Sequence, residues 1–268
     1  MPTRATARKS PAANVRYEFE GPIAVVTIDR PHVRNAVDSA TAAELVACFK
    51  HFVADDALAV AILTGAEGNF CSGFDLKEVA AGEDTRLHAK GQGPMGPTLM
   101  ELGKPVIAAV EGYAVAGGLE LALWCDLRVA GRDSTFGVFN RRFGVPLIDL
   151  GTVRLPRMIG EGRALDLILT GRPVPAPEAL QIGLVQRLVD TGEALNEARE
   201  IATQIAQAPQ RAMRADRRSA KAQWSMNLED AARAERAGGL KVISSGESQS
   251  GASEFARGRG RHGAQGED

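Results

Sequence analysis

The sequence predicts an α/β fold, with a sheet of buried strands covered by helices. Two observations predict this class. Short, continuous apolar runs recur through the first half of the chain, and the segments between them carry glycine turns or helical periodicity. Strands that are apolar along their whole length are typical of a sheet covered on both faces. The 268 residues suffice for one large domain or two smaller ones.

The first predicted elements are a strand and an amphipathic helix. Residues 23–28 (IAVVTI) are short and β-branched, and Pro31 ends the run, which favours a strand. Asp38 and Ser39 offer N-cap side chains for the helix that follows. Its apolar positions recur at helical spacing: Leu45, Cys48, Phe49 and Phe52.

Three further apolar runs predict the rest of the sheet. Residues 59–63, 106–110 and 127–130 are each too short for a buried helix and are bounded by turn residues. A helix is expected at 118–124, between the second and third of these runs. The sequence therefore alternates strands with helices as far as about Thr152.

The later part of the chain changes to mostly helical patterns, with helices expected at 193–207 and 210–223. The first residues carry basic side chains without an acid and two prolines, whereas the last are glycine, serine and charge. We therefore predict the following domains: a disordered leader at 1–16, a core at 17–205, a helical region at 206–245 and a mobile tail at 246–268.

The composition narrows the class of partner. A formal net charge of -1 argues against a general nucleic-acid or anionic-membrane surface, and no apolar run reaches the ~20 residues of a membrane-spanning helix. Three scattered cysteines are too few for a disulfide framework or a zinc site, and the histidines have no metal-ligand spacing. These features predict a cytoplasmic protein without a metal.

Two glycine-rich turns carry the predicted chemistry. Residues 69–76 (NFCSGFDL) and 111–120 (EGYAVAGGLE) each follow a buried strand and end where a helix begins. Amide groups at a helix start lack intrahelical partners, and the helix dipole there favours negative charge. Two such ends facing one point would form an oxyanion hole. Each turn taken alone is also compatible with a purely structural connection.

Glu120 is the candidate acid/base group. Its neighbours Leu119, Leu121 and Trp124 indicate a largely buried helix, and a buried carboxylate is costly unless it is paired or functional. The alternative is a carboxylate that caps the first turn of the helix.

The pair FCSGFDLKE and EGYAVAGGLELALWCD, in this order and spacing, resembles the signature of the crotonase (enoyl-CoA hydratase/isomerase) superfamily. Further segments that match are DRPHVRNAVD, FGV at Phe136 and LILTGRPVPAPEALQIGLV. The resemblance covers Tyr17 to Val189 well and the helical remainder loosely.

This resemblance implies a spiral of repeated ββα units followed by a C-terminal helical region that mediates trimers, often paired into hexamers. It also implies an acyl-CoA thioester as substrate, so that coenzyme A belongs to the substrate and no separate cofactor is expected. By position, the amides of Phe74 and Gly117 would hold the thioester oxygen. The residues expected to contact the substrate are Val33, Arg34, Ala36, Ser72, Phe74, Asp75, Leu76, Lys77, Gly117 and Asn140.

Two positions depart from the family pattern. Hydratases of the family use two glutamates around one water; the first matches Glu120, but Asn140 stands where the second is usual. An amide cannot donate and recover a proton as a carboxyl group does. Phe74 replaces a frequent alanine, which leaves the backbone donor intact.

Asp149 is a second acid/base candidate. It lies in PLIDLGT and resembles an aspartate that the dienoyl-CoA isomerase branch uses. The alternatives are an N-cap for the helix that starts near Thr152, or an ion pair with Arg141 or Arg142. Arg141 and Arg142 themselves are interpreted as a salt-bridged surface pair.

The predicted function is therefore an acyl-CoA enzyme that stabilises a thioester enolate, with enoyl-CoA hydration placed first. The oxyanion donors are Phe74 and Gly117, Glu120 is the acid/base with a pKa raised by burial, and Asp149 is its candidate partner. The alternatives are an enoyl- or dienoyl-CoA isomerase and a catalytically weakened CoA-ester binding protein.

Overall fold

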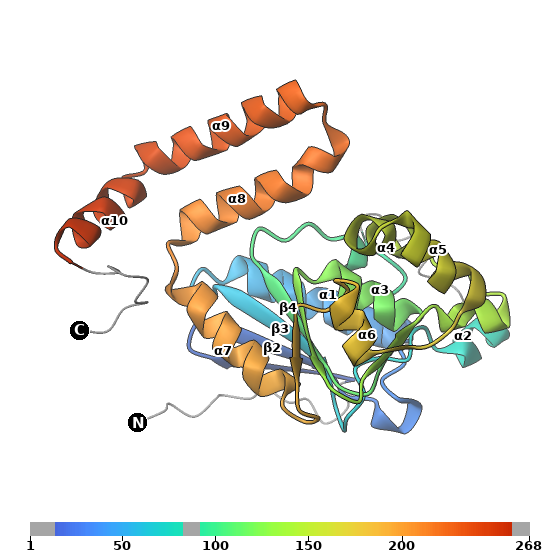
Figure 1. Cartoon of the computed structure of the whole chain (residues 1–268). Helices are drawn as coiled ribbons and strands as arrows, with labels where there is room; N and C mark the ends of the chain where they lie inside the picture. The colour runs from blue at the N-terminus through green and yellow to red at the C-terminus, as the bar shows by residue number, and fades with distance from the viewer. Residues whose placement is uncertain (1–13, 83–91, 259–268) are drawn as a thin grey trace. The chain divides into compact units, whose positions relative to one another are not determined.

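The chain folds into two compact units, one up to Ile205 and the other from Ala206 onward. The computed structural model describes residues 14–82 and 92–258 (Figure 1). Most of the predicted leader therefore lies outside the described residues. Its last two residues, Val15 and Arg16, belong to a strand, so the predicted boundary at residue 16 is wrong. They pair with Ile28 and Thr27 of the next strand.

The large sheet of the first unit forms its core. Its six strands lie in the order β1 (Val15–Glu20), β2 (Ile23–Ile28), β3 (Val60–Gly65), β4 (Val106–Val110), β6 (Leu127–Gly131) and β9 (Arg187–Val189). β1 is antiparallel to β2, and all the other neighbours are parallel. β2 and β4 are buried along their whole length, which is why they are apolar throughout. The α/β prediction is confirmed.

A second, smaller sheet contains β5 (Tyr113–Val115), β7 (Thr135–Gly137) and β8 (Val174–Pro175). Parallel bridges between Cys71 and Ala114 and between Val37 and Phe74 continue the same layer. The chain thus passes from the large sheet to the small one and then into a helix, as in β4–β5–α3. Successive turns of this kind stack in parallel, which is the spiral of ββα units that the resemblance implied.

Helices complete the first unit. Its α-helices are α1 (Ser39–Ala54), α2 (Leu76–Ala81), α3 (Gly117–Trp124), α4 (Gly151–Ile159), α5 (Glu161–Thr170), α6 (Ala176–Gln181) and α7 (Ala194–Gln207), the last of which runs into the second unit. Short 3₁₀ helices are η1 (Pro31–Val33), η3 (Pro97–Leu99) and η4 (Phe139–Phe143). Asp38 caps α1 as predicted, since its carboxylate accepts from Thr41 N at 2.8 Å.

Helix α3 is buried at every position, and a buried cation closes its C-terminus. Arg128 is 3% exposed, and its guanidinium group donates to the carbonyls of Ala122 (3.0 Å) and Cys125 (2.9 Å). It also donates to Leu184 O at 2.7 Å, which ties the helix end to the segment before β9. Arg128 therefore satisfies carbonyls that a helix C-terminus leaves without intrahelical partners.

The second unit consists of α8 (Gln210–Ala222), η5 (Gln223–Ser225), α9 (Leu228–Ser244) and α10 (Glu247–Ala256). The sequence predicted a mobile tail from 246, whereas residues 247–256 form a helix. Gly246 supplies the left-handed turn between α9 and α10, with φ 84. The carboxylate of Glu247 then accepts from the N–H groups of Arg211 (3.0 Å) and Ala212 (2.7 Å) at the start of α8. This contact between residues distant in sequence stabilises the glycine- and serine-rich segment as a helix.

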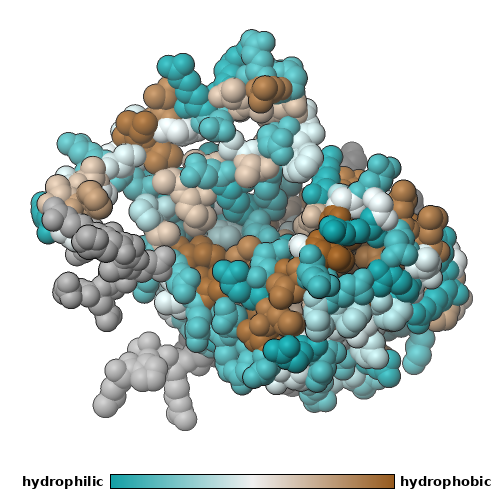
Figure 2. All heavy atoms as spheres, viewed as in Figure 1, coloured by the Kyte–Doolittle hydropathy of each residue, from teal (hydrophilic) through white to brown (hydrophobic). Residues whose placement is uncertain are grey.

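The helices of the second unit leave large apolar side chains uncovered, and Figure 2 shows hydrophobic residues scattered among hydrophilic ones over them. The most exposed are Leu228 (87%), Ile243 (62%), Phe255 (59%), Trp224 (54%) and Leu240 (54%). In the part of the chain that the structure describes, no helix has the length and apolar character needed to cross a membrane.

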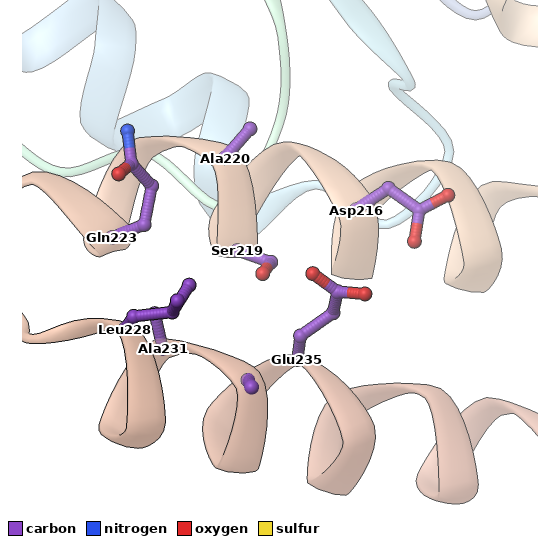
Figure 3. A pocket seen from close by; sticks show the side chains of 8 residues that line it. Asp216, Ser219, Ala220, Gln223, Leu228, Ala231 and Glu235 are labelled. Atoms are coloured by element: carbon purple, nitrogen blue, oxygen red, sulfur yellow. The ribbon is translucent and has the colours of Figure 1, made fainter.

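A groove of about 600 Å³ lies within the second unit, along α8 and α9 (Figure 3). Ser219 of α8 and Glu235 of α9 point toward each other across it. The complete lining is Asp216, Ser219, Ala220, Gln223, Leu228, Ala231, Ala232 and Glu235. Its carboxylates offer acceptors rather than the amide donors that a developing oxyanion needs.

Candidate active site

The two glycine-rich turns lie side by side. Backbone hydrogen bonds tie them, from Phe70 N to Glu111 O and from Cys71 N to Tyr113 O, each at 2.8 Å. Gly73 has φ 104, and a Cβ added to it would lie 3.0 Å from Gly117 N. The first turn therefore approaches the second at backbone distance, which only glycine permits here.

This approach places the predicted oxyanion donors together. Gly117 is the first residue of α3, where an N–H has no partner inside the helix. Phe74 follows Gly73 directly, so its amide belongs to the turn that touches Gly117. A Cβ on Gly117 would come within 2.6 Å of Met95 Sδ, so the methionine side chain lies against this amide. The structure brings the two turns together, and the role of the two amides stays a prediction.

Glu120 lies one helical turn beyond Gly117 and is 2% exposed. Its Oε1 accepts from Asp149 N at 2.9 Å and from Gly151 N, the first residue of α4, at 2.8 Å. Burial, and next the charge of Asp149, raise the pKa of Glu120 to about 7, although both amides and Arg154 act in the opposite direction. Glu120 contacts the start of a different helix, so it is not a capping residue of its own helix.

Asp149 is also 2% exposed and is held by residues 95–98, which precede β4. Its Oδ1 accepts from Met95 N at 3.1 Å and from the hydroxyl of Thr98. The N-cap of α4 is Leu150, with no side-chain capping bond, so the alternative in which Asp149 caps this helix is wrong.

Arg154 contacts the backbone on both sides of the Asp149 carboxyl group. Its guanidinium group donates to Asp149 O at 2.9 Å and to Thr98 O at 2.7 Å. It thereby joins η3 to the start of α4 and brings a positive charge near Glu120. Met95, Thr98 and Arg154 are functional candidates that the sequence reasoning missed. Their contacts with Asp149 span as many as 54 residues, and no local pattern reports such contacts.

Asn140 lies in η4, directly after β7, and is 7% exposed. Its Nδ2 donates to Val145 O at 2.7 Å, whereas its Oδ1 is buried without a hydrogen-bond partner among the described residues. Residues 145–151 therefore hold Asn140 at one end and Glu120 at the other. A buried oxygen without a partner is expected to accept from a water or a ligand group.

Arg141 and Arg142 contact the end of α5. Arg141 Nε donates to Ile168 O at 3.2 Å and Arg142 Nη2 to Gly171 O at 3.2 Å. The guanidinium carbon of Arg142 also lies 3.8 Å from the centroid of the Phe139 ring. These contacts give the two arginines a role in fixing η4 against α5.

The early loop predicted to approach coenzyme A lies against the first turn. Ser72 N donates to Arg34 O and Ser72 Oγ to Val33 O, each at 3.1 Å. Arg34 has φ 51, and its guanidinium group lies 5.5 Å from the centroid of the Tyr113 ring. Val33, Arg34 and Ser72 thus form one continuous surface.

The remaining predicted substrate contacts continue this surface into α2. Asp75 caps α2 by accepting from Lys77 N at 3.1 Å and pairs with Arg30 at 3.2 Å. Arg30 also donates to Ala36 O at 2.6 Å. Leu76 is 41% exposed, and Lys77, the next residue of α2, is exposed as well. Their binding roles stay predictions.

The described residues contain no group of three histidine, cysteine or acidic side chains that could hold a metal ion. The fold and the site define a class of protein: an α/β spiral in which two glycine-rich turns meet beside the buried carboxyl groups of Glu120 and Asp149. A model of the enoyl-CoA hydratase/isomerase family matches residues 18–262. The chain belongs to this family, which confirms the resemblance seen in its two turns.

Named relatives refine the comparison. The chain is 38% identical to the carnitinyl-CoA dehydratase of Salmonella arizonae over 230 residues, covering 85% of this chain and 88% of the relative. It is 40% identical to the short-chain-enoyl-CoA hydratase of Clostridium acetobutylicum over 197 residues, or 72% and 75%. A crystal structure of an enoyl-CoA hydratase from Mycobacterium tuberculosis H37Rv has a TM-score of 0.87 and 38% identity, covering 91% and 96%.

Proposed function

We propose that this acyl-CoA enzyme adds water reversibly across the α,β double bond of an enoyl-CoA thioester. The observation that carries the proposal is the position of Glu120, a buried carboxyl with its pKa raised to about 7, one turn from the Gly117 amide. The names of the relatives, a short-chain-enoyl-CoA hydratase and a carnitinyl-CoA dehydratase, support the same substrate class and both directions of the reaction.

The proposed reaction uses the helix end and the carboxylate together. The thioester oxygen accepts from Phe74 N and Gly117 N. The Glu120 carboxylate removes a proton from water, whose oxygen adds to the β-carbon while charge moves onto the thioester oxygen. The protonated Glu120 then returns a proton to the α-carbon, giving a 3-hydroxyacyl-CoA. Loss of one such oxyanion donor costs ~2.7–4 kcal/mol elsewhere, so the two amides are expected to lower the barrier by several kcal/mol.

Asn140 and Asp149 divide the remaining work in this proposal. The Asn140 Oδ1, buried without a partner among the described residues, accepts from the attacking water and orients it. The negative charge of Asp149 favours the protonated form of Glu120, which keeps the returning proton available. A single carboxyl group then performs both proton transfers.

Isomerisation of the double bond is the second candidate. It is favoured by the carboxyl pair of Glu120 and Asp149, because two such groups beside one oxyanion can remove a proton at one carbon and supply one at another. The absence of a carboxyl group at Asn140 costs this reaction nothing. The two candidates share the oxyanion hole and differ in the use of water.

The CoA portion would extend over the surface made by Val33, Arg34, Ser72 and α2. Arg34 and Lys77 are both exposed there and add positive charge for phosphates. We also propose a homotrimer or a dimer of trimers, because the second unit exposes Trp224, Leu228 and Ile243.

Three free thiols among the described residues support the predicted cytoplasmic location.

The deciding experiment incubates the purified protein with crotonyl-CoA in deuterated water. Hydration removes the enoyl absorbance and gives a 3-hydroxybutyryl product with deuterium at the α-carbon. Isomerisation shifts the absorbance or exchanges protons without adding water. A CoA-ester binding protein does neither, and that outcome would overturn both catalytic candidates.

A further inference from the structure

Ala116 adopts a backbone conformation that glycine normally supplies. Its angles, φ 52 and ψ −124, are those of the first central residue of a type II′ turn. A side chain there is strained, and such residues persist only where the surroundings over-determine them. Ala116 stands directly before the Gly117 amide, so the unusual conformation lies at the proposed oxyanion hole.

The surroundings hold Ala116 from three sides. Its N–H donates to Gly137 O of β7 at 2.9 Å, and its carbonyl accepts from Glu120 N at 3.2 Å. Its methyl group faces Gly73, since a Cβ added to Gly73 would lie 3.0 Å from the Ala116 Cβ. The methyl group therefore stands against the place where Gly73 has no side chain, between the two turns that carry the proposed donors.

We infer that Ala116 is a positioning residue whose methyl group, wedged against Gly73, fixes the direction of the Gly117 N–H relative to the Phe74 amide. The inference rests on the proposed oxyanion hole and adds a residue to it. The hydrogen bonds to Gly137 O and Glu120 N would survive in a glycine variant. The methyl contact would not, and glycine at this position gains access to other φ/ψ regions.

The inference predicts opposite effects on stability and on rate. Ala116→Gly removes the side-chain strain, so Tm should rise by about 2–4 °C or stay unchanged. The Gly117 donor becomes less well oriented, so kcat on crotonyl-CoA should fall by about tenfold or more with KM little changed. A residue with a merely structural role would move stability and rate in the same direction.

The test includes a readout that does not depend on turnover. Acetoacetyl-CoA, a β-keto thioester, gives an ultraviolet enolate band when its enolate oxygen is stabilised, whereas butyryl-CoA reports ground-state binding alone. Ala116→Gly should reduce the enolate band several-fold while the Kd for butyryl-CoA stays within about twofold. If the wild type shows the band without hydrating crotonyl-CoA, the hydratase proposal fails and the positioning role stands.

The matched control is Glu67→Gly. Glu67 also has positive φ (51), but it lies in the exposed turn after β3, outside the proposed site. This variant should change neither the rate nor the enolate band. Two outcomes for Ala116→Gly would overturn the inference: an unchanged kcat and enolate band, or a Tm that falls together with the rate.

Discussion

The chemistry of the site depends on how two neighbouring carboxyl groups are held. Glu120 and Asp149 are each 2% exposed, yet they accept from different partners. Asp149 is held by Met95 N and the Thr98 hydroxyl, and Glu120 by the amides of Asp149 and Gly151. Asp149 acts on Glu120 both through its charge, which raises the pKa, and through its amide, which lowers it. The net result is a buried carboxyl group whose pKa is raised to about 7.

Replacing Glu120 by Gln should remove proton transfer and leave binding intact. Glutamine is nearly isosteric, and its oxygen can still accept from Asp149 N and Gly151 N. The rate should fall by about a hundredfold or more, as for other general acid–base groups, with the Kd for butyryl-CoA little changed. Single-turnover kinetics and calorimetric titration measure the two quantities. Full turnover by Glu120→Gln would make Asp149 the leading base.

The raised pKa of Glu120 also predicts how stability depends on pH. Between the ordinary value of 4.5 and about 7, the folded state binds a proton that the unfolded state releases. Stability from this group is therefore complete below about pH 4.5 and is lost as pH rises through about 7. Going from pH 5 to pH 8, the wild type should lose about 2–3 kcal/mol relative to Glu120→Gln. Urea denaturation at each pH gives the difference, and parallel curves would contradict the assignment.

At Asn140, a substitution is expected to increase the hydratase activity rather than to reduce it. Asn140→Glu would place a second carboxyl group where the family's hydratases carry one, beside the segment that holds Glu120. We expect hydration of crotonyl-CoA to increase several-fold, because one group can then activate water while the other handles the α-carbon. Asn140→Asp is the matched control, since its carboxyl group is one methylene shorter. A drop in hydration with both variants would show that the buried amide oxygen itself is needed.

At the scale of elements, α3 connects the site to the rest of the core. Its N-terminus carries Gly117 and Glu120, and its C-terminus ends on the buried guanidinium group of Arg128. Arg128→Met would leave the carbonyls of Ala122, Cys125 and Leu184 without this donor. We expect a loss of about 3 kcal/mol or more in the free energy of unfolding, since a buried unsatisfied acceptor costs about 1–3 kcal/mol. Arg187→Met, at an exposed arginine of β9, should lose less than about 0.5 kcal/mol in the same denaturant titration.

The elements that carry the site were predictable because local patterns define them. The runs at 23–28 and 106–110 are apolar throughout and became β2 and β4 with the predicted bounds. The turn before α3 was visible from its glycines. The partners of Asp149 were not, because the chain passes through β4, β5, α3, β6 and β7 between Thr98 and Asp149. The helix at 247–256 was missed for a similar reason, since its first residue caps α8 far away in sequence.

At the scale of the whole molecule, the prediction concerns how many chains associate. The second unit exposes large apolar side chains, including Leu228 at 87% and Ile243 at 62%. We predict a trimer or a multiple of it, so light scattering should give about three or six times the mass of one chain. Leu228→Glu combined with Ile243→Glu should lower the mass, whereas Leu169→Glu on α5 of the first unit, equally apolar and 71% exposed, should not. A monomer at working concentration would contradict the proposal.

The parallel stacking of the small sheet has a consequence for how such an enzyme can diversify and be inhibited. Cys71, Ala114 and Phe136 lie on successive rungs of one ladder, and each rung is followed closely by a site residue: Phe74, then Gly117 and Glu120, then Asn140. In the proposed reaction, the residues after the first two rungs polarise the thioester, and the residue after the third orients the water. A substitution on the third rung can therefore change the reaction during evolution without disturbing the donors below it. An inhibitor that mimics the enolate alone should act across the family, whereas one that reaches Asn140 should discriminate among its members.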